Sequence, residues 1–472
     1  MAKVDTLMGK RSLPLSLLFL SGALKKSGYD VAVIHCTPEE MRRKLDWIDR
    51  KNPIFVGFSV ITGIPTLYAA QMSREIKKKC DTPVVWGGVH PTLLPEQCLQ
   101  ESYIDMVVLG EGEETVVEIA DRLSRGKSLE GVKGVGYKHD GKIKIEQRRP
   151  FIKNLDSFRI DFECVNLKEY IYPSRTHECR RRIEYFSSRG CPYNCGFCYN
   201  LAFHKRRWRG YSTDTVIEDI EYLKSKYNVD HVLFNDDNFF VNKNRAFEIV
   251  RKIDLPFSSS MRIDYITDKV ARTLKELGCK CLYIGMESGS DRILKLMNKG
   301  IRVADTIRAA HRLAENELRA QYSAIFGLPT ETEQEMEKTM NLIFRILDIH
   351  KESQFSVGPY IPYPGTDLYS LAIKEGFEPP SRTDGWSKLD RWKDTVDLPW
   401  IDTKSYFLLR LYLLSLHSNI KLISRYLRFR LKYKNFMKDY DTKLVAKVLN
   451  EVDRGTTIGL VFSKLIRNIM KW

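Results

Sequence analysis

The sequence predicts an α/β protein with two successive sheets: a doubly wound domain, then a partial (β/α)6 barrel, followed by a helical C-terminal tail. Short apolar runs alternate with helical segments over residues 1–125, which is typical of a doubly wound sheet. A second alternation of strands and helices covers residues 183–364. Its six strand–helix units favour a partial barrel over a complete barrel of eight units. We expect the first domain at 1–128, a connector at 129–180, the barrel at 181–395 and a basic helical domain at 396–472.

The composition is that of an ordinary globular protein. Of the 472 residues, 43% are hydrophobic and 29% are charged. The ten cysteines lack the regular spacing of a secreted disulfide scaffold. The apolar stretch at 13–24 has no signal-peptide cleavage pattern, and no apolar run is long enough to span a bilayer. These features exclude the secreted disulfide-rich and transmembrane classes.

The net charge of +16 is concentrated near the C-terminus. Residues 401–472 contain 15 Lys and Arg against 5 Asp and Glu, a net charge of +10. Nucleic acid, an anionic membrane surface and acidic substrates all bind basic surfaces, although a solvated basic face is the simplest explanation. In 421–438 basic residues alternate with Tyr, Leu and Phe, so we expect a helix that caps the barrel or lies on a membrane.

Glycines mark the ends of the strands expected in the first domain. These strands are 31–34, 54–58, 83–86 and 105–109, with helices at 15–26, 67–79 and 114–123. In such sheets ligands bind beyond the carboxyl ends of the strands, and glycine lets them approach the backbone. The candidate binding residues are Ser59, Gly87, Gly88, His90, Gly110, Glu111 and Gly112, and plain tight turns are the alternative explanation. The connector should contain a hairpin turning at Asp140-Gly141, with the task of joining the domains.

Charged and glycine-rich residues also follow the strands expected in the barrel. These strands are 183–187, 229–234, 257–261, 281–286, 321–326 and 354–358, and 213–226 should be a helix with Ser212 as its N-cap. The residues at the strand ends include Asp236, Asp237, Arg262, Glu287, Ser288 and Gly327. Because strand ends share one face of a β/α barrel, we expect these residues to surround one active site.

Three cysteines form the most specific motif of the chain. Cys191, Cys195 and Cys198 have the spacing C-x3-C-x2-C, directly after the first barrel strand. Three thiolates on a four-iron cluster leave one iron free to bind a small molecule, whereas most clusters have four thiolates. The alternative is zinc, with Cys179 or His204 as the fourth ligand, but zinc sites usually pair two C-x2-C motifs and no second pair occurs. The spacing therefore favours an iron–sulfur cluster.

This motif, with aromatic Phe197 before the last cysteine, resembles the signature of the radical S-adenosylmethionine (SAM) enzymes. The resemblance implies that Cys191, Cys195 and Cys198 hold a 4Fe-4S cluster whose fourth iron binds SAM, and that Phe197 lies near the adenine. It also implies reductive cleavage of SAM to a 5′-deoxyadenosyl radical that abstracts hydrogen from an unreactive carbon. An oxygen-sensitive cluster fits a reducing cytoplasm.

The other barrel motifs resemble SAM-contacting motifs of cobalamin-type radical SAM enzymes. Asp236 or Asp237 would accept from the SAM ammonium, and Arg262 would meet its carboxylate. Glu287 and Ser288 would contact the ribose or amino-acid end, and Gly327 would let the backbone approach the adenine. A solvated turn at Asp236-Asp237, and a carboxylate partner for Arg262, are the structural alternatives.

The first domain resembles the cobalamin-binding domain, a Rossmann-like fold, that precedes the barrel in one large class of radical SAM enzymes. The match runs from Pro14 to Glu113, and it implies that the glycine-rich strand ends bind cobalamin. The D-x-H-x-x-G motif, whose histidine ligates cobalt, does not occur in this chain. The resemblance therefore implies cobalamin without a protein histidine, or a domain that has lost its cofactor.

Together these features predict a cobalamin-dependent radical SAM enzyme that transfers a methyl group to carbon. The first alternative is cyclisation, oxidation or carbon–carbon coupling without methyl transfer. The second is a methylthio-transferring RNA modifier, whose additional cluster would have only Cys36, Cys80 and Cys98 as candidate ligands. A non-enzymatic zinc protein is the third. We expect a small-molecule or lipid-like substrate, a flavodoxin or ferredoxin as electron donor, no nucleic acid partner, and a cytoplasmic chain with peripheral membrane contact through its tail.

Overall fold

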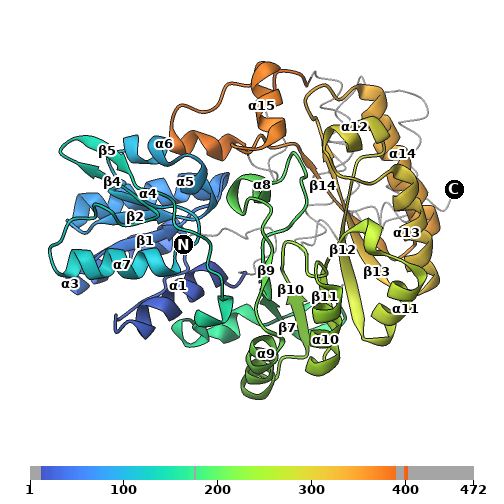
Figure 1. The fold of residues 1–472 in the computed structure, drawn as a ribbon, viewed down its shortest axis with the longest axis horizontal. Coiled ribbons are helices and arrows are strands. Elements are labelled where there is room, and N and C mark those ends of the chain that lie inside the picture. Colours follow the sequence, from blue (N-terminus) through green and yellow to red (C-terminus); the bar gives the residue numbers. More distant parts are fainter. Residues whose placement is uncertain (1–11, 175–176, 390–397, 402–472) are drawn as a thin grey trace, which may run out of the picture.

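The computed structural model describes residues 12–174, 177–389 and 398–401 (Figure 1). Two α/β bodies lie side by side, the first domain in blue to cyan and the barrel in green to orange (Figure 1). The expected basic helices and their membrane contact lie almost wholly outside the described residues. Within the described part of the chain, no helix combines the length and apolar character needed to cross a bilayer.

The first sheet has five strands in sequence order. The strands β1 (Val56–Ser59), β2 (Val84–Gly87) and β3 (Met106–Val108) are parallel, and β4 (Val135–His139) and β5 (Lys142–Ile145) continue the sheet antiparallel. The expected hairpin forms, with Asp140 and Gly141 both at positive φ. Because β4 pairs with β3, this hairpin extends the first sheet as well as leading toward the barrel.

The helices of the first domain pack around this sheet (Figure 1). They are α1 (Leu15–Lys26), α2 (Pro38–Arg42), α3 (Leu45–Lys51), α4 (Ile64–Lys79), α5 (Val89–Leu93), α6 (Pro95–Gln100) and α7 (Glu113–Ser124). The expected strand at 31–34 is wrong, because this stretch is not a strand in the structure. Val33 packs against the barrel core and Ile34 against the core of the first domain. Its apolar side chains thus contact two different cores instead of pairing in one sheet.

The second sheet is a curled half-barrel. Its order is β14-β13-β12-β11-β10-β7-β6, in which β7 through β14 are parallel and β6 is an antiparallel edge. The strands are β6 (Tyr172–Ser174), β7 (Cys179–Tyr185), β10 (His231–Phe234), β11 (Phe257–Met261), β12 (Cys279–Glu287), β13 (Arg319–Phe326) and β14 (Ser353–Pro359), with β8 (Ser188–Arg189) and β9 (Arg209–Gly210) pairing separately. The six parallel strands confirm the predicted partial barrel.

Helices cover the outer face of the half-barrel. They are α9 (Thr213–Tyr227), α10 (Lys243–Ile253), α11 (Asp268–Glu276), α12 (Asp291–Leu296), α13 (Val303–Glu315) and α14 (Glu333–Ile349), while α8 (Tyr199–Phe203) follows the cysteine loop and α15 (Asp367–Lys374) packs against that loop. On β13, Ala320, Tyr322, Ala324 and Phe326 are buried in the outer core, whereas the alternate residues are half-buried on the inner face. This alternation leaves the inner face accessible to a ligand.

Buried ion pairs join the two bodies. Arg189 at the start of the cysteine loop donates to Glu111 Oε1 over 3.1 Å and to Glu113 Oε1 over 2.6 Å. Arg209 Nη1 lies 2.7 Å from the other oxygen of Glu111. These arginine side chains are 14% exposed and the glutamates 5% or less. The ends of the first sheet are thereby tied to the base of the cysteine loop.

The chain also returns to the first domain after α15. The short helix η5 (Thr383–Lys388) packs on α4, where Asp384 and Arg74 form an ion pair at 2.6 Å. Trp386 is fully buried, and its indole nitrogen donates to the side-chain oxygen of Gln97 over 2.8 Å. This second connection adds an apolar contact to the ion pairs.

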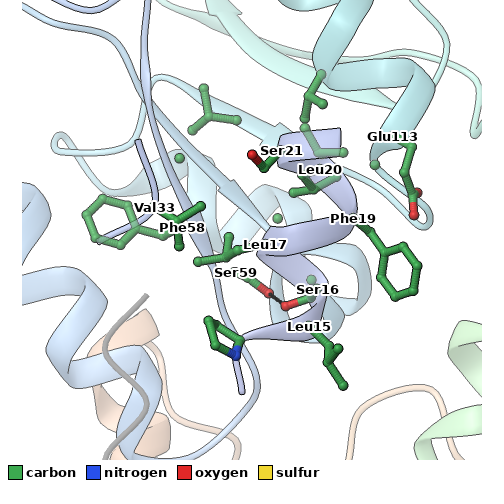
Figure 2. A pocket seen from close by; sticks show the side chains of 18 of the residues that line it. Leu15, Ser16, Leu17, Phe19, Leu20, Ser21, Val33, Phe58, Ser59 and Glu113 are labelled. Atoms are coloured by element: carbon green, nitrogen blue, oxygen red, sulfur yellow. Dashed lines mark hydrogen bonds between the residues drawn. The ribbon is translucent and has the colours of Figure 1, made fainter. Parts of the chain in front are cut away.

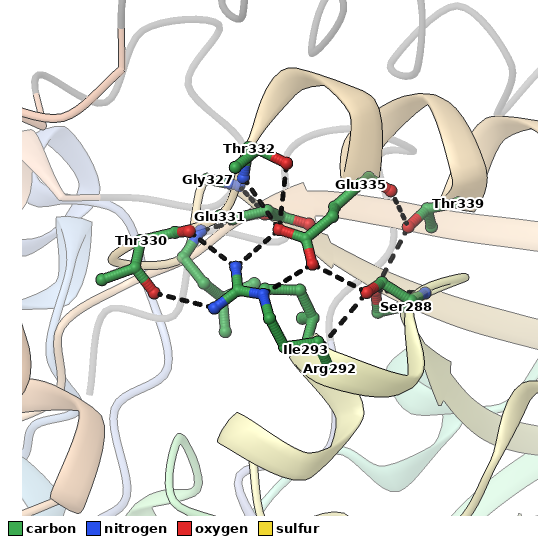
Figure 3. A network of polar contacts seen from close by, with 11 residues as sticks. Ser288, Arg292, Ile293, Gly327, Thr330, Glu331, Thr332, Glu335 and Thr339 are labelled. Carbon is green, nitrogen blue, oxygen red and sulfur yellow. Dashed lines mark hydrogen bonds and ion pairs between the residues drawn. The ribbon is translucent and has the colours of Figure 1, made fainter.

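A buried network fixes the end of β13 (Figure 3). Glu331 Oε2 accepts from the backbone nitrogens of Gly327, at 2.8 Å, and Leu328, at 3.1 Å, while its Oε1 has no hydrogen-bond partner. Burial raises the pKa of Glu331 to about 8. On neighbouring Glu335, the hydrogen bond from Arg292 lowers the pKa to about 2. The pKa values of two carboxyl groups one helical turn apart are thus shifted in opposite directions.

Replacing Arg189 by methionine should destabilise the protein by about 3–5 kcal/mol, because it leaves the buried Glu111 and Glu113 short of a cation. Urea unfolding at neutral pH would measure this loss. The matched control is Arg149→Met, whose partners Glu114 and Glu118 are 45% and 35% exposed, and which should cost only about 0–1 kcal/mol. Equal losses in the two variants would contradict the assigned importance of the buried pairs.

Glu331→Gln should change how stability depends on pH. The folded protein holds the Glu331 proton up to about pH 8, whereas the unfolded chain releases it near its ordinary pKa. The free energy of unfolding of the wild type therefore falls as the pH rises from the unfolded-state pKa to the folded-state pKa of Glu331. The glutamine variant has no proton to lose here, so its free energy of unfolding lacks this decrease. Its Tm relative to wild type should rise from pH 5 to pH 8.

Glu335→Gln is the matched comparison for that experiment. The lowered pKa of Glu335 means that its ionised form stabilises the fold above its unfolded pKa, and that this stabilisation is lost in acid. This variant should therefore lower the Tm at neutral pH and approach wild type as the pH falls. A Glu331→Gln variant with the same pH dependence as wild type would show that Glu331 is ionised in the fold.

Candidate active site

Asp237 holds the two ends of the cysteine loop together. It follows β10, and its carboxylate accepts from the backbone nitrogen of Gly190 and from the hydroxyl of Tyr199, both over 2.9 Å. These two residues stand immediately before Cys191 and immediately after Cys198. In the middle of the loop, Gly196 donates to the carbonyl of Met297 over 2.8 Å and accepts from Leu368 over 2.9 Å. The loop is thus fixed at both ends and at its centre.

The donor set of this loop fits a cluster with three protein ligands. Burial raises the pKa of the Cys191 and Cys198 thiols, that of Cys198 to about 12, and the nearby Cys195 thiol raises the pKa of both further. Cluster binding would therefore displace protons from the thiols. Among the described residues, no three His, Cys, Asp or Glu side chains converge as ligands of a single metal ion.

Among the described residues, neither Cys179 nor His204 forms a metal-ligand group with the three cysteines, although His204 packs beside Gly190, next to Cys191. Cys179 starts β7, whereas the cysteine loop follows the opposite end of that strand. His204 is buried, stacks on Phe151 and faces Phe203 edge-on. Burial lowers its pKa to about 4. The structure thus offers the loop three thiols and no fourth ligand of either predicted kind.

Cations flank the loop on the barrel side. The Arg262 guanidinium stacks 3.6 Å from the ring centroid of Tyr193 and pairs with Asp264 over 2.8 Å. Lys299 lies 5.6 Å from the ring centroid of Phe197 and forms an ion pair with Glu287 over 2.7 Å. Both cations are close enough to Cys195 for its thiolate to raise their pKa. The predicted Phe197, Arg262 and Glu287 therefore do come together beside the cysteines.

Lys299 was missed by the sequence analysis. It stands in the turn after α12, outside any strand-end motif, and only its contacts with Glu287 and Phe197 reveal it. Glu287 has a positive φ of 59°, an uncommon conformation for this residue type, and also accepts from Ser323 over 3.1 Å. Such strain at the end of a strand is typical of functional sites.

Three predicted SAM residues have structural partners. Asp236 is buried and accepts from the backbone and hydroxyl of Ser187 and from the hydroxyl of Ser188, and burial raises its pKa to about 6. Ser288 is buried beside Thr339, with 3.2 Å between their hydroxyl oxygens. Asp237 is exposed, but both its carboxylate oxygens accept from the loop. These contacts stabilise the cysteine loop and the strand ends around it.

Gly327 lies at the end of β13 with a φ of 71°. Its carbonyl accepts from the indole nitrogen of Trp400 over 2.9 Å. A Cβ atom at this position would lie 2.3 Å from the side chain of Ile401, so a larger residue would displace the returning chain. The glycine therefore permits a close approach, which in this structure is made by residues 400–401.

A cavity of about 970 Å³ lies between the first domain and the barrel (Figure 2). Its first-domain wall includes the predicted residues Ser59, Gly87, Gly88, Gly110, Glu111 and Gly112, and its barrel wall includes Glu184, Phe186, Tyr199, His204, Asn235 and Asp237. Apolar side chains of α1 and β1, with the hydrogen-bonded pair Ser16 and Ser59, line the part shown in Figure 2. Its size and its glycine-rich strand ends fit a large cofactor such as cobalamin.

His90 does not line this cavity. Its fully buried ring lies 5.8 Å from that of Trp386, and its Nδ1 is 3.2 Å from the hydroxyl of Thr62. Burial lowers its pKa to about 3. His90 therefore supports the packing of η5 on the first domain, and the glycine that precedes it in the motif, Gly88, is the residue that reaches the cavity.

The inner face of the barrel carries pairs of polar side chains. In the sheet register, Gln321 of β13 stands beside Gln354 of β14, and Ser323 stands beside Ser356. All four are half-buried, and Ser323 connects this face to Glu287. The floor below is closed by His177, whose Nε2 lies 3.0 Å from the hydroxyl of Tyr283. A ligand on this face would therefore meet amides and hydroxyls.

Comparison with known proteins agrees with this geometry. The family model described as "Radical SAM superfamily" matches residues 185–343, and that described as "B12 binding domain" matches residues 8–120. A curated relative, the uncharacterized methyltransferase PH0819 of Pyrococcus horikoshii, is 35% identical over 78% of this chain and 80% of its own length. The anaerobic magnesium-protoporphyrin IX monomethyl ester cyclase of Rubrivivax gelatinosus is 26% identical over 75% of this chain and 65% of its own length.

A solved structure shares the fold. The radical S-adenosylmethionine methyltransferase TsrM of Kitasatospora setae, determined with cobalamin and a [4Fe-4S] cluster bound, superposes with a TM-score of 0.62 at 20% identity, over 77% of this chain and 76% of that one. A radical SAM domain implies a 4Fe-4S cluster and SAM, and a B12-binding domain implies cobalamin. With the residues that directly precede and follow its cysteine loop lining a cavity shared with the B12-binding domain, the chain belongs to the radical SAM superfamily, in the class with an N-terminal B12-binding domain.

Proposed function

We propose that this enzyme transfers a methyl group to an unactivated carbon of a small polar substrate. The observation that carries the proposal is the cavity, because it joins the B12-binding strand ends to Tyr199 and Asp237, which flank the cysteine loop. A methyl donor bound in this cavity and a radical generated at the loop would act on the same substrate. The methyltransferase relative, which this chain matches along 80% of its length, supports the same reaction class.

The residues of the chain bind, orient and shield the reacting groups. Cys191, Cys195 and Cys198 would hold the cluster, and Phe197 would stack near the adenine of SAM. When bound, the cluster, SAM and cobalamin supply one electron, a 5′-deoxyadenosyl radical and a methyl group. Arg262 and the Glu287–Lys299 pair would bind the amino-acid end of SAM, while apolar residues of α1 and β1 would exclude water from the cavity.

Asp236, Asp237, Ser288 and Gly327 would act mainly by positioning. Their contacts fix the cysteine loop and the ends of β12 and β13, rather than leaving their polar groups available to SAM. Ser59, Gly87, Gly88, Gly110 and Gly112 would line the cobalamin site, whereas Glu111 would join the domains there through Arg189 and Arg209. The residues of the barrel would therefore hold the cysteine loop in place, whereas Ser59 and the glycines would form the wall of the cavity.

The inner barrel face favours a polar substrate over a lipid-like one. Side-by-side amides at Gln321 and Gln354, and hydroxyls at Ser323 and Ser356, would be left without partners by a hydrocarbon. These four side chains therefore favour a substrate that carries hydrogen-bonding groups.

Other radical chemistry is the second candidate, and the cyclase relative favours it. Cyclisation would release 5′-deoxyadenosine without adding a methyl group, so product mass separates the two. The RNA methylthiolation alternative lacks support in the structure: Cys36, Cys80 and Cys98 are buried in the apolar core of the first domain.

Cys198→Ala should abolish reductive SAM cleavage and lower the iron content, since a cluster needs its three thiolates. The measurement is 5′-deoxyadenosine and methylated product by mass spectrometry after anaerobic reconstitution with cobalamin and SAM. Cys164→Ala, which removes a half-buried cysteine of the connector, is the matched control and should keep about four irons per chain. Full turnover by the Cys198 variant would refute the proposed radical SAM site.

Ser59→Phe should reduce bound cobalamin by about tenfold or more while leaving the iron content unchanged, because the phenyl ring would fill part of the cavity. Visible absorbance after desalting reports cobalamin, and chemical iron analysis reports the cluster. Ser59→Ala removes only the hydroxyl that contacts Ser16 and should bind cobalamin as wild type does. Unchanged cobalamin binding by the phenylalanine variant would place the cofactor elsewhere.

A further inference from the structure

An exposed basic turn is packed directly on the cysteine loop. Lys205, Arg206 and Arg207 are consecutive and exposed, and they follow Cys198 by fewer than ten residues. The guanidinium nitrogen Nε of Arg206 donates to the carbonyl of Pro192 over 3.2 Å. Pro192 is the residue after Cys191, so this cationic turn borders the outer side of the loop.

The backbone of the turn also contacts the other side of Cys191. A Cβ atom on Gly190 would lie 2.1 Å from the carbonyl oxygen of Arg207, so this approach requires glycine at position 190, where φ is 81°. Lys205 and Arg206 themselves have positive φ values of 49° and 60°. Two successive large residues in this conformation cost free energy, which indicates that the turn is held in a specific shape.

Within the described part of the chain, no acidic side chain pairs with the cations of this turn. No ion pair recorded within residues 12–174, 177–389 and 398–401 includes Lys205, Arg206 or Arg207. Lys243 adds a fourth exposed cation on the other side of the loop: it lies 4.3 Å from the ring centroid of Tyr265, whose hydroxyl is 2.6 Å from that of Tyr193. The half-buried loop tip, Pro192 to Asn194, is thus bordered by positive charge, with Asp264 engaged by Arg262.

We infer that a basic rim is the docking surface for an acidic electron-transfer protein of the flavodoxin or ferredoxin type. This rim consists of the turn at 205–207 together with Lys243. The inference rests on the proposed function, because radical chemistry requires that one electron reach the cluster from outside. At docking, one electron leaves the reduced flavin or iron–sulfur centre of the donor and reduces the cluster, and no bond or proton is exchanged. The half-buried tip, Pro192 to Asn194, lies between these cations and is the part of the loop that a donor would reach.

The chemistry of such a partner fits the surface. Electron-transfer complexes are weak and bury small interfaces, so long-range attraction between opposite charges contributes much of their formation rate. A rim of four cations beside the loop tip would both attract an acidic donor and orient its redox centre toward the cysteines. Such attraction is screened by salt over about 8–10 Å at moderate ionic strength.

The test is a triple charge reversal, Lys205→Glu, Arg206→Glu and Arg207→Glu, in the full-length reconstituted enzyme. Binding of oxidised flavodoxin at low ionic strength should weaken about tenfold or more, and flavodoxin-driven SAM cleavage should slow similarly. Cleavage driven by reduced methyl viologen, a small cation that the reversed charges do not repel, should not slow. Both flavodoxin effects should disappear at about 0.5 M salt, where charges are screened within a few ångströms.

The chain provides a matched control. Arg42, Arg43 and Lys44 form another exposed basic run, which begins at the last residue of α2 and ends just before α3, and their reversal changes the net charge by the same amount. This second variant should bind flavodoxin and turn over as wild type does. If the two triple variants behave alike, net charge and not the rim determines the effect, and the inference is overturned.

Two further measurements keep the result decisive. If the reversal of 205–207 lowers cluster content, the variant Lys205→Gln with Arg207→Gln, which retains the Arg206 contact with Pro192, should still weaken flavodoxin binding at least threefold. Unchanged binding in this variant would refute the docking surface, as would binding of single-stranded RNA in place of flavodoxin. A wild-type enzyme that binds flavodoxin at this rim but cannot cleave SAM with methyl viologen would instead refute the proposed function alone.

Discussion

The two hydrogen bonds that Asp237 accepts, from Gly190 and from Tyr199, are the interaction on which the rest of the site depends. One carboxylate, placed at the end of a central barrel strand, accepts from residues on both sides of the three-cysteine loop. A loop of this length has little secondary structure of its own, so its shape must come from such contacts. Buried Asp236 fixes the preceding serines in the same way. The two adjacent acids thereby turn a flexible segment into a preorganised ligand set.

The second constraint is the fixed placement of the first domain against that loop. Arg189 lies within two residues of Cys191 and binds two glutamates at the end of β3, so the loop and the B12-binding strand ends are held by the same side chain. The returning segment around Trp386 adds a second, apolar attachment. Methyl transfer from one cofactor to a substrate radical that another cofactor generates would require both cofactors to face one substrate, and rigid coupling of the domains provides this geometry.

Much of this arrangement could be predicted from local sequence patterns. The strand–helix alternation predicted both sheets, and the cysteine spacing predicted the loop, because these features repeat or cluster along the chain. The roles of Asp236 and Asp237 were harder to predict, since their partners lie nearly fifty residues away. The contact of His90 with Trp386 joins two segments that are far apart in the sequence and leaves no local signal. Val31–Ile34 was misread because its pattern fits a strand, while tertiary packing against two cores prevails over propensity.

We infer that the cysteine loop and the cavity form one reaction site for two redox cofactors. Electron paramagnetic resonance of the enzyme loaded with both, at the cobalt(II) and singly reduced cluster states, tests it most directly. The account predicts a magnetic interaction that splits or broadens both signals, since the cavity borders the residues flanking the loop. Two spectra that simply add, with no interaction between the spins, would contradict it.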